Sequence, residues 1–354
     1  MTLIRVETLE ALYRRFAGHH GAADEEASTF AAVLLRADLR GHTTQGAGLL
    51  PYLDELLDDG EMAFGRPLEM LRESAATAVL DGHRGVGQVV GARAMALAVE
   101  KARSAGIGFV SVRRSSDYSM ASAYVLQALD AGLIGLSMST GPILVAPWGG
   151  RDARFCTNPI ALGVPAGRRD PIVIDMATSA YSMGAVVRAA RDGRRLETPG
   201  VVDAEGRYSD DPAAVVLDVM ARESRMAGAL LPAGPKGFGW LLLVELLSGL
   251  LSGERTWEDE RPATSEDRPA HYGQTFVAID VAHFADSQEF ATAADRMIET
   301  LAGSRPAEGF ERVRLHGAEA AEEERRRREH GVPVRDEEWA IVERLVARLG
   351  IAAP

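Results

Sequence analysis

The segment LIGLSMSTGPILVAPWGGRDARFCTNPIALGVPAGRRDPIVIDMATS, residues 133–179, decides the fold class of this chain. Short apolar and β-branched runs are separated here by Pro- and Gly-rich turns, a pattern typical of consecutive strands. It predicts strands at Leu133–Ser139, Ile160–Val164 and Ile172–Asp175.

The same runs continue outward on both sides, now alternating with stretches of helical spacing. Further strands are expected at Ala78–Asp81, Gly108–Val112 and Phe276–Val281, and helices at Val89–Ala105, Met120–Ala131 and Met183–Gly193. Residues 198–212 are rich in Pro, Gly and Asp and are expected to form a long excursion. Strands that alternate with helices predict a mixed α/β sheet.

Helical patterning dominates both ends of the chain. Asp24 is the expected N-cap of a helix that runs to Gly41, and a second helix is expected from Gly46 to Asp59. We expect a helical segment, residues 1–75, to pack with a C-terminal helical segment, residues 305–354, beside an α/β cofactor-binding region, residues 76–304. In EEERRRREHG, residues 322–331, Glu and Arg four residues apart predict a solvated helix face.

Composition excludes several classes of protein. The chain has 354 residues, 46% hydrophobic and 25% charged, as in ordinary globular proteins. Its net charge of −12 disfavours nucleic acid and anionic membranes as partners. A single cysteine, Cys156, cannot form an internal disulfide, and the start lacks the apolar core of a secretory signal, so a cytoplasmic location is expected. The apolar stretch Phe238–Leu251 contains Glu245 and is too short to span a membrane, so a buried helix is expected there. No metal site is expected.

Three motifs allow more than one interpretation. GVGQVVG, residues 85–91, resembles a dinucleotide fingerprint, but its spacing is off by one and no acid follows at the required distance, so a closely packed strand-to-helix turn is favoured. In PAGPKGFG, residues 232–239, Lys236 and Gly237 open an apolar helix, which suits either a phosphate site with exposed amides at Lys236 and Gly237 or an ordinary capped core helix. In IDMATS, residues 174–179, the hydroxyls suit a helix cap better than a ligand contact.

Taken together, these segments resemble the type 2 malate/L-lactate dehydrogenases, which include ureidoglycolate, sulfolactate and diketogulonate dehydrogenases and cyclic-ketimine reductases. The resemblance covers most of the chain, and the order and spacing of its segments are specific. It is carried by RADLRGHTTQG, DGHRGVGQVVG, VRRSSDYS, APWGGRDARFCTNPIALGVP, IDMATS, PAGPKGFG and LHGAEAAEEERRRREHGVPV.

The resemblance implies a mixed-sheet, non-Rossmann NAD(P)-binding fold of the L-sulfolactate dehydrogenase-like type. It also implies NADH or NADPH as cofactor, a small-molecule substrate, and a homodimer whose site lies near the subunit interface. The implied cofactor contacts are Thr140, Asp175, Met176, Ala177, Thr178, Lys236 and Gly237. His316 and Gly317 stand where the family has a Pro-Gly-Glu pattern, so contacts are expected there on weaker grounds.

The catalytic motifs depart from the family. Gln45 stands where the family has the histidine of a Ser-His-Gly motif, and Asp117 stands where it has a second histidine. Leu49 and Tyr52 stand where arginines that could hold a substrate carboxylate usually follow. Because a glutamine cannot exchange a proton near neutral pH, His42 and Asp117 are the candidates for a substitute acid or base, and Asp117 is favoured by its matching position.

These replacements lead to a hypothesis about the substrate. A ketone needs a proton as hydride arrives, whereas a protonated imine already carries one, and Asp117 could stabilise its charge. The sequence therefore predicts an NAD(P)H-dependent oxidoreductase that reduces a C=N or C=O substrate. The alternatives are a nucleotide-binding relative without redox turnover, which acts as a scaffold, and a non-redox reaction in the same cleft.

Overall fold

A computed structural model describes residues 1–216, 227–254 and 272–351 of the chain. The α-helices are α1 (Val6–His19), α2 (Asp24–Leu39), α3 (Leu50–Asp58), α4 (Gly87–Ala105), α5 (Ser122–Asp130), α6 (Met183–Arg191), α7 (Gly234–Val244), α8 (Ser287–Ala302), α9 (Ala318–His330) and α10 (Asp336–Arg348). The strands are β1 (Thr2–Ile4), β2 (Glu69–Glu73), β3 (Thr77–Asp81), β4 (Ile107–Arg113), β5 (Ile134–Ser139), β6 (Ile160–Val164), β7 (Ile172–Met176), β8 (Val201–Asp203), β9 (Tyr208–Ser209), β10 (Gly228–Leu230), β11 (Gln274–Ile279) and β12 (Val332–Val334).

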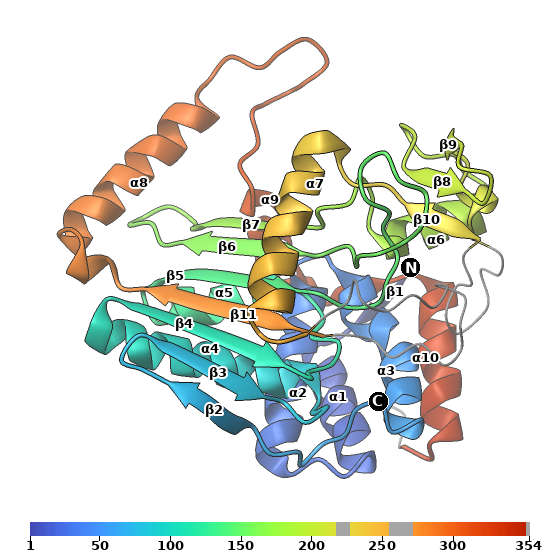
Figure 1. The fold of residues 1–354 in the computed structure, drawn as a ribbon, viewed down its shortest axis with the longest axis horizontal. Coiled ribbons are helices and arrows are strands. Elements are labelled where there is room, and N and C mark those ends of the chain that lie inside the picture. Colours follow the sequence, from blue (N-terminus) through green and yellow to red (C-terminus); the bar gives the residue numbers. More distant parts are fainter. Residues whose placement is uncertain (217–226, 255–271, 352–354) are drawn as a thin grey trace.

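A mixed sheet forms the centre of the described structure (Figure 1). Its seven strands follow the order β2-β3-β4-β11-β5-β6-β7 within the described residues. The pair β3 and β4 is parallel and the other neighbours are antiparallel. The expected mixed α/β fold is therefore confirmed, and each predicted strand exists within a few residues of its expected bounds.

Strands β2, β8, β9, β10, β1 and β12 were not predicted from the sequence. Most of them have only two or three residues, too few to show an alternating pattern. The expected excursion at 198–212 thus contains β8 and β9, which join β10 in a small antiparallel sheet.

Helices cover both faces of the central sheet (Figure 1). On one face α4 and α5 pack against β4, β5, β6 and β11, and on the other α7 leads into a π-helical turn, η4 (Glu245–Leu250). The GVGQVVG segment forms the expected close turn. A side chain at Gly87 would overlap the carbonyl of Asp117, and a Cβ at Gly91 would lie 2.7 Å from the ring of Tyr124.

Both ends of the chain share one apolar core. It joins α1, α2 and α3 to β12 and α10 through side chains such as Leu34, Leu53 and Val342. Strand β1 also pairs antiparallel with β12, with Leu3 opposite Pro333. This core fixes the position of the polar corner at residues 40–46, which follows α2.

Two helix starts differ from the sequence expectation. Ala23, not Asp24, is the N-cap of α2, because Asp24 already has helical geometry. The segment from Gly46 does not begin as an α-helix. The 3-10 turn η1 (Thr43–Gln45) precedes Gly46 and a second, η2 (Ala47–Leu49), follows it, and α3 begins only at Leu50, with a proline in its first turn.

The expected solvated face of the C-terminal charged helix is only partly correct. Glu323 and Arg327, four residues apart, form an ion pair of 2.7 Å, as the spacing predicts. Arg327, however, is buried, and its guanidinium donates a 2.6 Å hydrogen bond to the backbone carbonyl of Asp38. Arg40 is also buried and pairs with Glu324 at 3.0 Å. Helix α9 is therefore tied to the polar corner after α2.

The apolar run Phe238–Leu251 is helical but not buried as expected. Trp240, Leu246, Leu250 and Leu251 are each about half exposed in a single chain. Among the described residues, no helix combines the length and hydropathy that crossing a bilayer requires.

Candidate functional site

The buried carboxylate of Asp38 packs against the end of the polar corner at residues 40–46. Both Asp38 oxygens accept hydrogen bonds from the Ala47 amide, each at 3.2 Å, and the Tyr13 hydroxyl donates another. A Cβ on Gly46 would overlap this carboxylate. Burial raises the pKa of Asp38 to about 7, although the bonds from Tyr13 and Ala47 act in the opposite direction. Asp38 therefore fixes the backbone immediately after Gln45.

Asp117 lies in a second loop that follows β4. Its Oδ1 accepts a 2.8 Å hydrogen bond from the amide of Ser119. The Ser119 hydroxyl in turn donates to the backbone carbonyl of Gln45, so the two loops lie side by side. Burial raises the pKa of Asp117 to about 6, and the Ser119 amide moves it in the other direction. The structure thus brings together the loops that carry Gln45 and Asp117.

A pocket of about 330 Å³ lies at the end of β7, beside the polar corner. Four predicted site residues line it: His42, Asp175, His316 and Gly317. Its other lining residues are Arg40, Ser122, Val173, Arg314, Leu315, Glu319 and Ala320. This volume lies within the range of small-molecule sites.

Asp175 is the acidic centre of this pocket. It accepts a 2.8 Å hydrogen bond from the Ser122 amide, which opens α5. Burial raises the pKa of Asp175, while Ser122 and the nearby His42 favour its charged form. For His42 the removal of water lowers the pKa and the attraction of Asp175 raises it. His42 and Asp175 therefore act electrostatically on one another across the pocket.

The start of α7 differs from the expected pair of exposed amides. The helix begins at Gly234, and the Gly237 amide already donates to the carbonyl of Ala233 at 3.1 Å. Gly237 is buried, and a Cβ there would lie 2.9 Å from the carbonyl of Thr178. The expectation of a free Gly237 amide is therefore wrong, and its small size instead allows α7 to approach the turn after β7. Lys236 is exposed at this helix start.

The remaining predicted cofactor residues differ in exposure. Thr140 is buried, and its side-chain oxygen accepts a 2.9 Å hydrogen bond from the Gly273 amide. Thr178 is also buried, and its hydroxyl donates to the carbonyls of Thr157 and Asn158. Met176 is exposed and Ala177 is partly exposed. The favoured interpretation of Thr178 as a helix cap is therefore wrong, because Ser182 is the N-cap of α6 and its hydroxyl accepts a hydrogen bond from the Ala185 amide.

Sequence reasoning missed the role of Asp38 and the tyrosines near Asp117. The phenol oxygens of Tyr52 and Tyr272 lie 3.1 Å apart. No sequence signal joins two residues so far apart in the chain. Asp38, in contrast, is a charged residue within the apolar pattern of α2, which is a signal of a buried polar partner.

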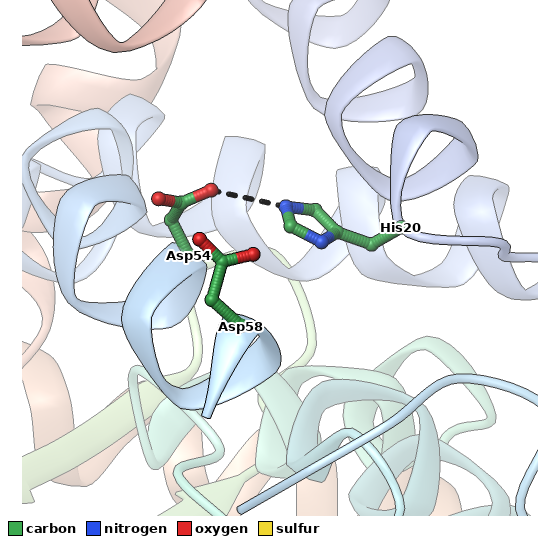
Figure 2. A group of neighbouring side chains, drawn as sticks. All are labelled: His20, Asp54 and Asp58. Atoms are coloured by element: carbon green, nitrogen blue, oxygen red, sulfur yellow. Dashed lines mark hydrogen bonds and ion pairs between the residues drawn. The ribbon is translucent and has the colours of Figure 1, made fainter. Parts of the chain in front are cut away.

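One cluster of possible metal ligands lies outside this site. His20, Asp54 and Asp58 offer ligand atoms within 4.8 Å of one another (Figure 2). His20 Nε2 is 3.1 Å from Asp54 Oδ1. Arg348 pairs with Asp54 and lies 3.8 Å from Asp58, so a guanidinium already neutralises these carboxylates. The cluster therefore links His20, at the end of α1, to α3 by a hydrogen bond, and α3 to α10 by ion pairs.

The sequence and the fold of this chain match those of known proteins. Residues 4–343 match the model of the family described as malate/L-lactate dehydrogenase. A malate dehydrogenase of Pyrococcus abyssi is 35% identical over 340 residues, which are 94% of this chain and 90% of that protein. The sulfolactate dehydrogenase structure from Methanocaldococcus jannaschii superposes with a TM-score of 0.87 at 29% identity, covering 99% and 98% of the two chains. The Δ1-piperideine-2-carboxylate reductase from Pseudomonas syringae pvar. tomato gives 0.84 at 30% identity, covering 98% and 100%.

The fold and these matches define an enzyme of the oxidoreductase class. The chain belongs to the malate/L-lactate dehydrogenase family, and its fold is that of sulfolactate dehydrogenase.

The pKa of Asp38 leads to a prediction about stability. Because the folded-state pKa is raised from 3.8 to about 7, neutral Asp38 favours the folded state. That contribution is fully present below pH about 4 and is lost as the pH rises to about 7. We expect the free energy of unfolding of Asp38→Asn, measured by urea titration at several pH values, not to show this decrease as the pH rises.

The exposed Asp130, which pairs with Arg36, supplies the control. Asp130→Asn should follow the wild-type pH profile. A profile of Asp38→Asn parallel to that of the wild type between pH 4 and 7 would show that Asp38 is charged in the folded protein.

Proposed function

We propose that this protein is an NAD(P)H-dependent reductase of a C=N substrate, with a C=O compound as the weaker substrate. The observation that carries the proposal is the position of Asp117, a partly buried carboxylate held beside Gln45 through Ser119. Its pKa near 6 leaves it ionised at neutral pH. A partly buried negative charge next to the reacting group favours a cationic substrate.

The pocket at the end of β7 suits part of a dinucleotide. His42, Asp175, His316 and Gly317 line it, and the start of α7 with Lys236 lies against the same turn through Gly237 and Thr178. The proposed cofactor contacts also include Thr140, Met176, Ala177 and Thr178. When bound, the reduced nicotinamide supplies a hydride.

Asp117 and Gln45 then act on the substrate. Ionised Asp117 stabilises the positive charge of a protonated imine, which needs no proton donor from the protein. The amide of Gln45 orients the reacting group but does not move a proton. His42 lies in the polar corner and lines the pocket, where burial lowers its pKa and the charge of Asp175 acts in the opposite direction. A ketone lacks its own proton and gains little from a carboxylate.

Steady-state turnover tests this function. We expect a cyclic imine to be reduced with a higher kcat/KM than the ketone of the same ring size. For the imine, kcat/KM should fall as the pH drops through about 6, because Asp117 becomes protonated. Asp117→Asn should abolish this fall and lower kcat/KM for the imine about 100-fold.

The direction of the pH dependence separates the two roles of Asp117. If Asp117 donated a proton instead, kcat/KM would fall as the pH rises through about 6. That result, or faster turnover of the ketone, would refute the proposed charge-stabilising role.

We further propose that the enzyme is a homodimer. Trp240, Leu242, Leu246, Leu250 and Leu251 form an exposed apolar surface on α7 and the turns after it, termed here the α7 surface. Helix α8 projects from the body (Figure 1) and also exposes Met297 and Leu301. Large exposed apolar patches are typical of protein interfaces, and a second copy is the proposed partner.

Sedimentation equilibrium tests the dimer. The wild type should have twice the mass of one chain, because burying the α7 surface is favourable. The double variant Leu246→Asp/Leu250→Asp should be monomeric, while Leu3→Asp, which alters an exposed leucine of β1, should remain dimeric. A monomeric wild type would contradict the proposal. A cytoplasmic location stays a prediction from the sequence.

A further inference from the structure

A pair of tyrosines joins the helical segment to the loop that carries Asp117. Tyr52 lies on α3, Tyr272 lies just before β11, and their phenol oxygens are 3.1 Å apart. The carbonyl of Tyr272 accepts a 3.1 Å hydrogen bond from the amide of Ser115, two residues before Asp117. The ring of Tyr272 is thereby fixed beside the Asp117 loop.

Tyr272 also borders the turn after β5. A Cβ on Gly141 would lie 3.1 Å from Cε1 of Tyr272 and 3.1 Å from the sulfur of Cys156. Both Tyr272 and Cys156 are buried. Because residue 141 is a glycine, the ring of Tyr272 can pack directly against the turn that follows Thr140. This packing limits the movement of the Tyr272 ring and therefore of its hydroxyl.

The hydroxyl of Tyr272 remains a neutral hydrogen-bond donor. Its pKa is raised well above the ordinary tyrosine value, first by burial and then by electrostatic interactions with Tyr52 and Asp117. In the orientation in which Tyr52 donates to Tyr272, the Tyr272 hydroxyl keeps its hydrogen for another acceptor.

The charges around Asp117 argue against an anionic substrate. The nearby Arg113 and Arg114 direct their guanidinium groups to the buried Asp81, at 2.9 and 2.8 Å. Within the described part of the chain, burial and the Ser119 amide are the influences that set the pKa of Asp117, and no cation is among them. A substrate carboxylate here would face a second carboxylate and neutral hydroxyls, which is unfavourable.

We propose that Tyr272 binds a neutral hydrogen-bond acceptor on the substrate, that Tyr52 positions Tyr272, and that the substrate is a cyclic imine carrying a carboxamide or hydroxyl in place of a carboxylate. This inference rests on the proposed reductase function, since it names the substrate class for the same site. Tyr272 is the residue that contacts substrate, and Tyr52 acts through it.

Calorimetric binding tests the inference without turnover. The probes are two saturated cyclic amines of the same ring, one with a carboxamide and one with a carboxylate, added to the wild-type protein in the presence of oxidised cofactor. We expect the carboxamide to bind at least 10-fold more tightly. Tyr272→Phe should weaken its binding about 10-fold, as the loss of one hydrogen bond predicts, and should leave the plain unsubstituted amine unaffected.

Two further variants complete the design. Tyr52→Arg should shift the preference toward the carboxylate by at least 10-fold, since it adds a cation beside Tyr272. Tyr208→Phe, on β9 in the smaller sheet, is the matched control and should bind like the wild type.

The outcomes separate this inference from the proposed function. Tighter binding of the carboxylate by the wild type, or carboxamide binding unchanged in Tyr272→Phe, would overturn the inference even if imines are reduced. The expected binding preferences with no imine turnover would refute the reductase function and leave the recognition by Tyr272 supported. Absence of binding by both probes would overturn both.

Discussion

The hydrogen bond from the Ser119 hydroxyl to the Gln45 carbonyl is the contact on which the site depends. It joins a corner of the helical segment to a loop at the end of a sheet strand. Each side is fixed independently: Asp38 holds the backbone after Gln45, and the Ser116 hydroxyl accepts from the Gly87 amide at 2.8 Å. The position of Asp117 is therefore fixed by both the helical segment and the sheet.

Charge is divided between two neighbouring parts of this region. In the pocket at the end of β7, Asp175 faces His42, and Arg40 and Arg314 line the walls in ion pairs with Glu324 and Glu319. Around Asp117 the described neighbours are hydroxyls and an amide, and the nearby arginines are engaged by Asp81. The carboxylate of Asp117 suits a cation, as the proposed imine substrate requires.

Much of the sheet was predictable because its strands are apolar runs bounded by turns. Ile160–Val164 is an example, since Pro159 and Pro165 delimit it and β6 has the same bounds. The short strands β8 and β9 were not predictable, because two or three residues show no period and their pairing with β10 is a tertiary property. The exposed α7 surface was mistaken for a buried face because apolar composition does not reveal what covers it.

Parts of the site were also predictable, for a different reason. Gln45 and Asp117 stood out because they replace histidines in recognisable motifs, and the structure brings their loops together. Tyr272 and Arg327 gave no such signal, since their partners Tyr52 and Asp38 lie far away in the sequence. The Gly237 amide was misjudged because the first residue of a helix decides which amides are free, and sequence rarely fixes that residue.

Titration of NADH and NADPH, followed by nicotinamide fluorescence, tests most directly whether the pocket beside His42 and Asp175 holds the cofactor. The account predicts saturable binding of at least one cofactor by the wild-type protein, weakened about 10-fold in Asp175→Ala, with Tyr208→Phe unchanged. Unsaturable fluorescence with both cofactors, or equal affinity in Asp175→Ala, would contradict it.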